Sequence, residues 1–565
     1  MNRLIDVCFD RRGYTTDFLK DIDDPSHDDL INIHELCAEL KDVHDSGRRL
    51  VILPDFDMDG IMSGTLGFAG FSELGFAVSL FRPSPSDGYG FNAETVDRLL
   101  TEYPDTAAII TCDVGITCSE GIARAHERGV RVFVTDHHMQ SGDCSADIIV
   151  DPNSEAQGYG KDVRIGGMCG AAVFWNVLDC YAEAYGNEFI GEQIRRLRVF
   201  AGIGTVSDVM PMLYGNRELV RDACGICRLV HGTGDTFFVD NMLGSRAYVS
   251  AFRGLYAALD VFFENGKLTK PSDIDEEFFG YYLAPMFNSV KRMDGDMDTA
   301  FGVFFGTSPR DDAHELFELN EKRKATVARY YDQLMDGDQD GAPFVYVSDA
   351  PAGILGLLAT KVLASTDMPV VVVRQDGSRY HGSGRAPAWY PALTMLHKEG
   401  FWAAGHEGAF GVGVTDRREL GSLSAFLERS AKEVYDELPE EETTAQGADI
   451  VISTLGDGDT DIDIPLFAEY VSELRDFAPF GRGFEAPVVE FRFAPEDAEW
   501  STMGSLKQHV KGRFAHGFEL LVWNGAAHLR EWQQANVIRA YGKLGINTFA
   551  GRRTVNFIGQ SVEVE

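Results

Sequence analysis

Four short apolar runs in the first 150 residues predict buried strands, because each is rich in small and branched apolar residues and is too short for a helix. They lie at residues 51–53, 107–111, 130–134 and 148–150. Stretches of small and apolar residues separate or follow them, and we expect helices at residues 61–75, 119–128 and 170–185. Strands that alternate with helices are typical of βαβ units, so the sequence predicts a largely parallel sheet.

Each of these runs stops at acidic residues. In chain order, the residues that follow the runs are Asp55, Asp57 and Asp59, then Asp113, then Asp136, His137 and His138, and finally Asp151. A single Asp after a strand is ordinary turn chemistry. Acidic residues or histidines after several strands of one sheet indicate a binding site instead, because α/β proteins bind ligands at the carboxyl edge of the sheet. We therefore expect these side chains to form one binding site.

The three carboxylates at residues 55–59 repel one another unless a cation binds between them, so they predict a divalent metal site. An acidic solvated turn is the alternative. The spacing D-x-D-x-D-G also matches the start of an EF-hand loop, but Leu66 stands where that loop needs a Glu, and a strand rather than a helix precedes it. Imidazole next to carboxylates favours Mn²⁺, with Mg²⁺ as the second choice.

The sequence changes pattern twice beyond this region. Residues 218–335 are mostly helical in spacing and predict a connector. Residues 344–347 and 369–373 read as strands around a helix at residues 355–364, which predicts a second, smaller α/β lobe.

Alternating strand-like segments then occupy residues 488–493, 518–522, 537–544 and 554–564. Short strands with glycine-rich turns fit a five-stranded OB barrel, a fold that holds single strands by stacking and backbone charge. Phe514, Trp523 and Phe549 are candidates for stacking on bases, with positions in the core as the alternative.

Charge is distributed unevenly along the chain. The net charge of −37 argues against unspecific binding to nucleic acid, which usually needs a basic surface. Residues 501–565, however, carry eight Lys and Arg against four Glu. A mildly basic end module on an acidic body remains compatible with binding a polyanion.

The nine cysteines are scattered and odd in number, which indicates a reducing compartment rather than a disulfide framework. Only Cys224 and Cys227 have metal-like spacing, and we expect them on a helix facing the core. The sequence shows neither a membrane-spanning run nor a secretory signal, so we expect a cytoplasmic protein with no membrane partner.

The triplet Asp136-His137-His138, together with Asp113 and the acidic loop, resembles the motifs of the DHH phosphoesterase superfamily. Further segments resemble, in the same order, those of its single-stranded-DNA-specific exonucleases. These segments are Gly88-Tyr89-Gly90, residues 204–211 with Asn216-Arg217, residues 284–288 with Arg292-Met293, residues 382–385, Gly405-His406 and residues 479–483. The resemblance covers nearly the whole chain.

The resemblance implies a metal set of Asp55, Asp57, Asp59, Asp113, His137 and Asp208 that holds two ions. Two ions need a bridging carboxylate, for which Asp113 is the candidate. Asp57 and Asp59 are the primary ligands of the loop, whereas Asp55 is either a ligand or a neighbour that orients one. His138 would lie beside the scissile phosphate, and we group Asp136 with it as catalytic.

The resemblance also implies a substrate-binding set. Ser383 and Arg385, on an expected glycine-rich loop, would anchor the 5′-phosphate of the substrate. The other members of the set are Tyr89, Asn288, Arg292 and His406. A surface ion pair is the alternative for Arg292.

Several positions depart from the family pattern. They are Ala404, Ala386 and Phe484, and Ser84 in place of an expected arginine, with Arg82 lying before Pro83 instead. These departures concern recognition of the substrate end rather than the metal set.

The expected fold class is α/β, with a parallel-sheet DHH domain at residues 1–217 and a helical connector at 218–340. A smaller α/β DHHA1 domain follows at 341–440, then an acidic linker and helix at 441–480 and a β-barrel OB-fold at 481–565.

The expected function is metal-dependent 5′-to-3′ hydrolysis of single-stranded DNA in repair or recombination. The alternatives are a phosphoesterase for short oligonucleotides or cyclic dinucleotides and an inactive nucleic-acid-binding scaffold. The expected partners are single-stranded DNA and a single-strand-binding or other repair protein. We expect the protein to be a monomer.

Overall fold

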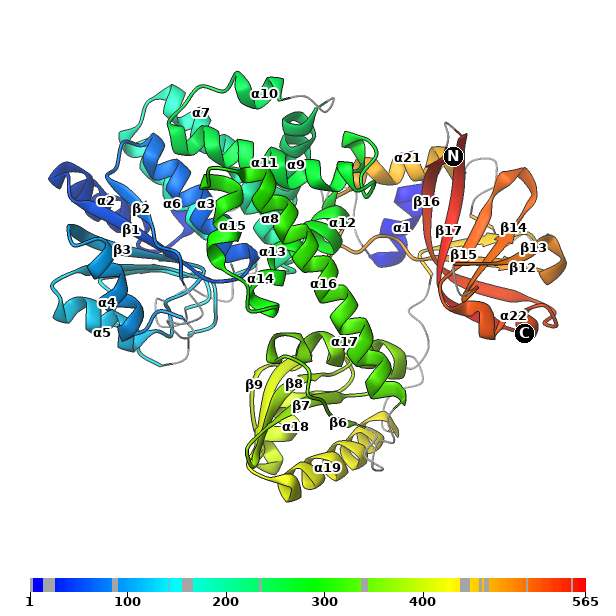
Figure 1. Ribbon diagram of the computed structural model, residues 1–565. Coiled ribbons are helices and arrows are strands. Elements are labelled where there is room, and N and C mark those ends of the chain that lie inside the picture. Colours follow the sequence, from blue (N-terminus) through cyan, green and yellow to red (C-terminus); the bar gives the residue numbers. More distant parts are fainter. Residues whose placement is uncertain are drawn as a thin grey trace. The chain divides into compact units, whose positions relative to one another are not determined.

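The computed structural model is shown in Figure 1. It describes residues 4–13, 26–83, 90–140, 142–154, 166–232, 236–336, 344–436, 448–456, 460–461, 467–504, 507–549 and 552–565. The chain divides into two compact units. The larger unit comprises residues 25–210 and 218–443, and the smaller unit comprises residues 1–24, 211–217 and 444–565. Among the described residues, no helix is long and apolar enough to cross a bilayer.

A five-stranded parallel sheet forms the first part of the larger unit, in the order β2-β1-β3-β4-β5. Its strands are β1 (Arg49–Pro54), β2 (Val78–Leu80), β3 (Thr106–Cys112), β4 (Arg131–Thr135) and β5 (Ile148–Val150). Four of them are the predicted strands. The prediction missed β2, because this three-residue edge strand is only partly buried and gives no clear apolar run.

Helices cover both faces of this sheet (Figure 1), which is why its central strands are continuously apolar. One face packs on α4 (Ala93–Glu102) and α5 (Ser119–Glu127). On the other face, α3 (Met58–Glu73), α6 (Gly170–Tyr185) and α8 (Arg198–Ser207) pack against one another. The glycines of α3 permit this close packing, since a side chain at Gly67 would collide with the ring of Phe174.

The region predicted as a connector is helical. Its main helices are α9 (Gly215–His231), α11 (Arg246–Glu264), α13 (Ala284–Phe287), α14 (Ser289–Arg292), α15 (Met297–Phe305) and α16 (Pro309–Asp336). Cys224 and Cys227 lie on α9 with both side chains buried, as expected. The last helix of the series, α16, contacts α17 (Leu355–Thr366) of the second lobe.

The second lobe contains a five-stranded sheet in the order β6-β7-β8-β10-β9. The strands are β6 (Val345–Val347), β7 (Val370–Asp376), β8 (Arg379–Arg385), β9 (Trp402–His406) and β10 (Ala409–Val414). Alternate valines of β7 face opposite sides. Val370 and Val372 pack towards α17, whereas Val371 and Val373 pack towards α18 (Ala392–Glu399) and α19 (Arg417–Asp436).

One expectation for this lobe was wrong. Ser383 and Arg385 do not lie on a glycine-rich loop but on strand β8, which pairs with both β7 and β10. The glycines of this segment serve close packing instead of flexibility. A side chain at Gly384 would collide with the ring of Phe410, and one at Gly382 would collide with the backbone of Val372.

The smaller unit is built on a seven-stranded sheet in the order β11-β12-β16-β17-β15-β14-β13, where five strands were expected. These strands are β11 (Ile450–Ser453), β12 (Val489–Phe493), β13 (Glu499–Met503), β14 (His509–Arg513), β15 (Glu519–Val522), β16 (Ile538–Phe549) and β17 (Arg552–Val564). Phe514 lies in the aromatic core of this unit, whereas Trp523 is 53% exposed and stands edge-on to His509.

Two segments from earlier in the chain belong to the smaller unit. Helix α1 (Leu4–Arg12) is joined to it by an ion pair between Arg12 and Asp449 at 2.7 Å. Arg217 donates to the carbonyl oxygens of Phe477 and Pro479 at 2.8 and 2.6 Å, and it stacks on the ring of Phe484. The departure at Phe484 therefore has a packing role, since the ring is buried beneath a guanidinium.

Candidate metal centre

The loop after β1 is held by its own carboxylates and backbone. Asp57 caps the start of α3, where its side chain accepts from the amides of Asp59 and Gly60 at 3.1 and 3.2 Å. A side chain at Gly60 would collide with the backbone of Asp55, so only glycine permits a turn this tight. The loop thus directs its acidic side chains toward the carboxyl ends of β3 and β4.

Three groups of side chains at this edge have ligand atoms that all lie within 4.8 Å of one another. The groups are Asp55, Asp57 and Asp113; Asp59, His137 and Asp208; and Asp113, His137 and His138. All six residues of the expected metal set are therefore brought together. Asp113 and His137 each belong to two groups.

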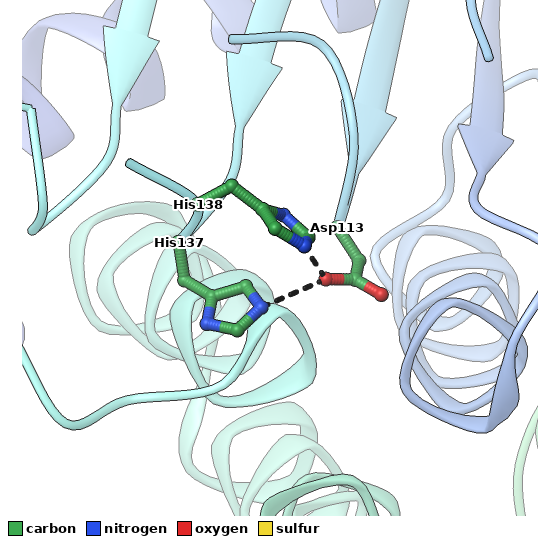
Figure 2. Close-up of side chains that lie close together, drawn as sticks. All are labelled: Asp113, His137 and His138. Atoms are coloured by element: carbon green, nitrogen blue, oxygen red, sulfur yellow. Dashed lines mark ion pairs between the residues drawn. The ribbon is translucent and has the colours of Figure 1, made fainter. Parts of the chain in front are cut away.

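Asp113 lies at the centre of the cluster (Figure 2). One of its carboxylate oxygens, Oδ1, lies 3.1 Å from Nε2 of His137 and 4.0 Å from Nδ1 of His138. The same Nε2 of His137 lies 3.6 Å from Asp208 and 4.0 Å from Asp59. Asp113 adopts a left-handed backbone conformation with φ of 63°, which directs its side chain inward from the end of β3.

Buried atoms without hydrogen bonds test whether these residues fit a metal ion. Asp55 Oδ1, Asp113 Oδ1 and His137 Nε2 are all buried and make no hydrogen bond, although the last two lie close together. Buried polar atoms are normally satisfied, so three orphans in one cluster need an explanation. Carboxylate oxygens and a neutral imidazole nitrogen are ligands for a divalent ion, and the donor set fits one.

The pKa shifts of these side chains also favour a bound cation. Burial, reinforced by the neighbouring carboxylates, raises the pKa of Asp55 to about 6 and that of Asp113 well above its usual value. Burial also raises the pKa of Asp59. A bound cation would remove this cost, because it stabilises the ionised carboxylates. Burial lowers the pKa of His137, which keeps this imidazole neutral and able to act as a ligand.

Asp136 and His138 form a separate pair beside the cluster. Asp136 is buried and belongs to none of the three groups. Its carboxylate accepts from the amides of Ile116 and His137 at 3.0 and 2.8 Å and lies 2.8 Å from Nδ1 of His138. This hydrogen bond outweighs the effect of burial and raises the pKa of His138 to about 9.

Backbone groups that the sequence reasoning did not single out also shape the centre. The amides of Gly170 and Ala171, at the start of α6, donate to the Asp59 carboxylate at 2.6 and 3.2 Å. A side chain at Gly170 would collide with Asp113, and one at Gly204 would collide with Asp59. Gly204 belongs to one of the motif segments named from the sequence, but the packing roles of both glycines depend on contacts distant in sequence.

The predicted substrate-binding residues lie in different settings. Asn288 accepts from the amide of Met58 at 2.8 Å and so braces the metal loop. Ser383 and Arg385 lie on β8, and His406 lies at the exposed end of β9. Arg292 ends α14, where burial lowers the pKa of its guanidinium and the Asp57 carboxylate offsets only part of this effect. Tyr89 lies outside the described residues.

Comparison with known proteins defines the class. The family model for the DHH family, N-terminal domain, matches residues 49–202, and the model for the RecJ OB domain matches residues 461–561. Residues 49–202 are thus similar to the DHH family, N-terminal domain, and the end module is similar to the RecJ OB domain. The expected fold class is confirmed.

The individual relatives are RecJ proteins. The chain is 25% identical to the single-stranded-DNA-specific exonuclease RecJ of Dickeya dadantii, over 94% of this chain and 90% of that protein. It is 24% identical to RecJ of Escherichia coli over the same shares. The crystal structure of RecJ from Thermus thermophilus with Mn²⁺ matches the whole chain and 76% of that protein, with a TM-score of 0.74 at 21% identity.

Proposed function

We propose that this protein is a metal-dependent exonuclease that removes nucleotides from the 5′ end of single-stranded DNA. The observation that carries the proposal is the buried cluster around Asp113, where three unsatisfied ligand atoms meet. Two further findings support it. The relatives along 94% of the chain are single-stranded-DNA-specific exonucleases, and an OB domain of the RecJ type follows the catalytic part.

The centre would hold two divalent ions, with Mn²⁺ preferred and Mg²⁺ as the alternative. Asp59, His137 and Asp208 would bind one ion, Asp55 and Asp57 the other, and Asp113 both. When bound, such a pair activates a water molecule and neutralises the charge that develops on the phosphate. The imidazole of His137 is the reason for preferring Mn²⁺.

His138 would donate a proton or a hydrogen bond to the reacting phosphate. Asp136 lies 2.8 Å from its Nδ1 and raises its pKa to about 9, which favours the protonated ring, and the opposite edge, Nε2, would then face the substrate. Asp136 acts through His138 and is therefore a positioning residue.

Ser383 and Arg385 would anchor the 5′-phosphate of the DNA. A hydroxyl and a planar guanidinium match phosphate oxygens well. Arg292, His406 and Tyr89 would contact the strand, whereas Asn288 is also committed to the metal loop. This anchor would place the terminal phosphodiester at the metal centre and so set the direction of digestion.

The proposed activity on single-stranded DNA also suggests a cellular role. We infer a role in DNA repair or recombination, as a monomer in the cytoplasm, together with a single-strand-binding or other repair protein. The net charge of −37 supports this inference, because an acidic body gains little from electrostatic attraction to DNA unaided.

The test is digestion of end-labelled single-stranded DNA with Mn²⁺ by the wild type, by His137→Ala and by His126→Ala. His126 is a matched control, because it forms an exposed ion pair with Asp147 away from the cluster. We expect early release of a 5′ label by the wild type and by His126→Ala, and loss of activity in His137→Ala. Release of a 3′ label first, or equal activity in all three, would contradict the proposal.

A further inference from the structure

A lysine of the helical connector contacts the metal loop. Nζ of Lys291, on α14, lies 3.7 Å from Oδ2 of Asp55. Asp55 is only 6% exposed, whereas the side chain of Lys291 is 34% exposed. The ammonium group therefore reaches a buried member of the expected metal set from a partly exposed position.

A second contact holds the segment that carries this lysine. Helix α14 follows α13 directly, and Asn288 between them keeps helical backbone angles. Positions i and i+3 share one face of a helix, so Asn288 and Lys291 lie on the same side of this segment. Oδ1 of Asn288 accepts from the amide of Met58 at 2.8 Å. One face of the connector thus contacts the loop at both Asp55 and Met58.

The two carboxylate oxygens of Asp55 have different surroundings. Oδ1 is buried and makes no hydrogen bond, whereas Oδ2 faces the ammonium group of Lys291. Asp55 can therefore offer Oδ1 to a divalent ion while Oδ2 stays paired with the lysine. This arrangement keeps a positive charge beside the ion that Asp55, Asp57 and Asp113 would bind.

The charges of the centre indicate what this lysine changes. The six expected ligands are five aspartates and the imidazole of His137, which burial keeps neutral. Two divalent ions already offset most of the negative charge of five carboxylates, and Lys291 adds a further positive charge. At short range an ammonium group repels a divalent ion and attracts a phosphate. The lysine therefore opposes one ion and favours an anionic substrate.

We propose that Lys291 is a positioning residue that makes binding of the second divalent ion depend on DNA. This inference rests on the proposed function. Without DNA, the ammonium group weakens binding of the ion that shares Asp55, and it acts less on the ion of the group that contains Asp59, His137 and Asp208. A bound strand brings a phosphate whose negative charge offsets the lysine, and the second ion then binds more tightly. By linkage, this ion strengthens the binding of DNA by the same factor.

The test is calorimetric titration with Mn²⁺ of the wild type, Lys291→Met, Lys291→Arg and Lys41→Met. Lys41 is a matched control, because it pairs with Asp45 on α2 (Ile33–Ser46) and its side chain is also 34% exposed. The titration is run at about pH 8, where Asp55, whose pKa is raised to about 6, is ionised. We expect Lys291→Met to tighten the weaker Mn²⁺ site by about tenfold without DNA. Lys291→Arg and Lys41→Met should bind Mn²⁺ as the wild type does.

A second titration adds single-stranded DNA with phosphorothioate linkages, which slow hydrolysis. We expect this DNA to tighten the weaker Mn²⁺ site of the wild type by about tenfold, and that of Lys291→Met by less than about threefold. Thermal unfolding checks that each variant is folded.

A Lys291 that only orients Asp55 would give the opposite sign, because its loss would weaken Mn²⁺ binding. Weaker or unchanged Mn²⁺ binding by Lys291→Met would therefore overturn the proposal, as would an equal effect of DNA on the wild type and Lys291→Met. The failure of the proposed function is distinguishable, because it would appear as absent Mn²⁺-dependent digestion by the wild type even if Lys291→Met tightens Mn²⁺ binding.

Discussion

The carboxylate of Asp136 lies 2.8 Å from Nδ1 of His138. It is buried and also accepts hydrogen bonds from the amides of Ile116 and His137, so it is not free to bind an ion. In the sequence Asp136 follows a strand, as the expected metal ligands do, but it is grouped with His138 as catalytic and not with the metal set. In the structure, too, it belongs to none of the three metal-compatible groups. Its contacts suit it to orient His138.

Replacement of Asp136 tests this separation. We expect Asp136→Asn to lower kcat by about a hundredfold, since it weakens an acid catalyst. Affinity for Mn²⁺ should change little, because no ligand is removed. Steady-state kinetics and Mn²⁺ titration measure the two quantities, and a loss of Mn²⁺ binding as large as the loss of kcat would contradict the assignment.

The glycine beside Asp59 offers a second test. Gly204→Ala introduces a methyl group that collides with the Asp59 carboxylate, and we expect it to weaken Mn²⁺ binding by about tenfold to a hundredfold. Gly225→Ala is the matched control, because a Cβ at this helical glycine would have nothing within 4 Å. Calorimetric titration of both variants with Mn²⁺ measures the difference, and equal affinities would contradict the packing argument.

Metal ions should stabilise the fold. The buried carboxylates Asp55, Asp59 and Asp113 repel one another in the absence of a cation. Free Mn²⁺ at a hundred times its Kd should therefore add about 2.7 kcal/mol to the free energy of unfolding per site. Thermal unfolding with Mn²⁺ and with EDTA measures the gain, which should be much smaller in His137→Ala. An equal gain in this variant would place the ions elsewhere.

Salt should also stabilise the protein, since a net charge of −37 produces self-repulsion in the compact state. The screening length falls from about 10 Å at 0.1 M to about 3 Å at 1 M ionic strength. We expect Tm to rise when KCl is raised over this range. A Tm that falls or stays constant would show that the acidic surface is already neutralised by its ion pairs.

The sequence predicted the structure best where a single pattern, such as an apolar run, determined the position of a strand. Fully buried strands such as β3 read as apolar runs, and a strand end fixes the position of the residue that follows it. Asp113 and His137 could therefore be assigned to one edge of a sheet before their contacts were known. The strands β8, β9 and β10 were missed because glycines interrupt them, and those glycines are explained only by partners such as Phe410.

The parts of the site that could not be predicted depend on tertiary contacts. Asn288 braces the metal loop from 230 residues away, and no local pattern indicates such a bond.

The most direct test of the whole account is the number of Mn²⁺ ions bound at equilibrium by the wild type, Asp113→Asn, Asp208→Asn and Asp151→Asn. Asp151 is the control, because it is a buried carboxyl at the end of β5 outside every metal-compatible group. The account predicts two ions for the wild type and for Asp151→Asn, weaker binding of both ions in Asp113→Asn, and weaker binding of one in Asp208→Asn. A single ion in the wild type, or two ions bound with unchanged affinity by Asp113→Asn, would contradict it.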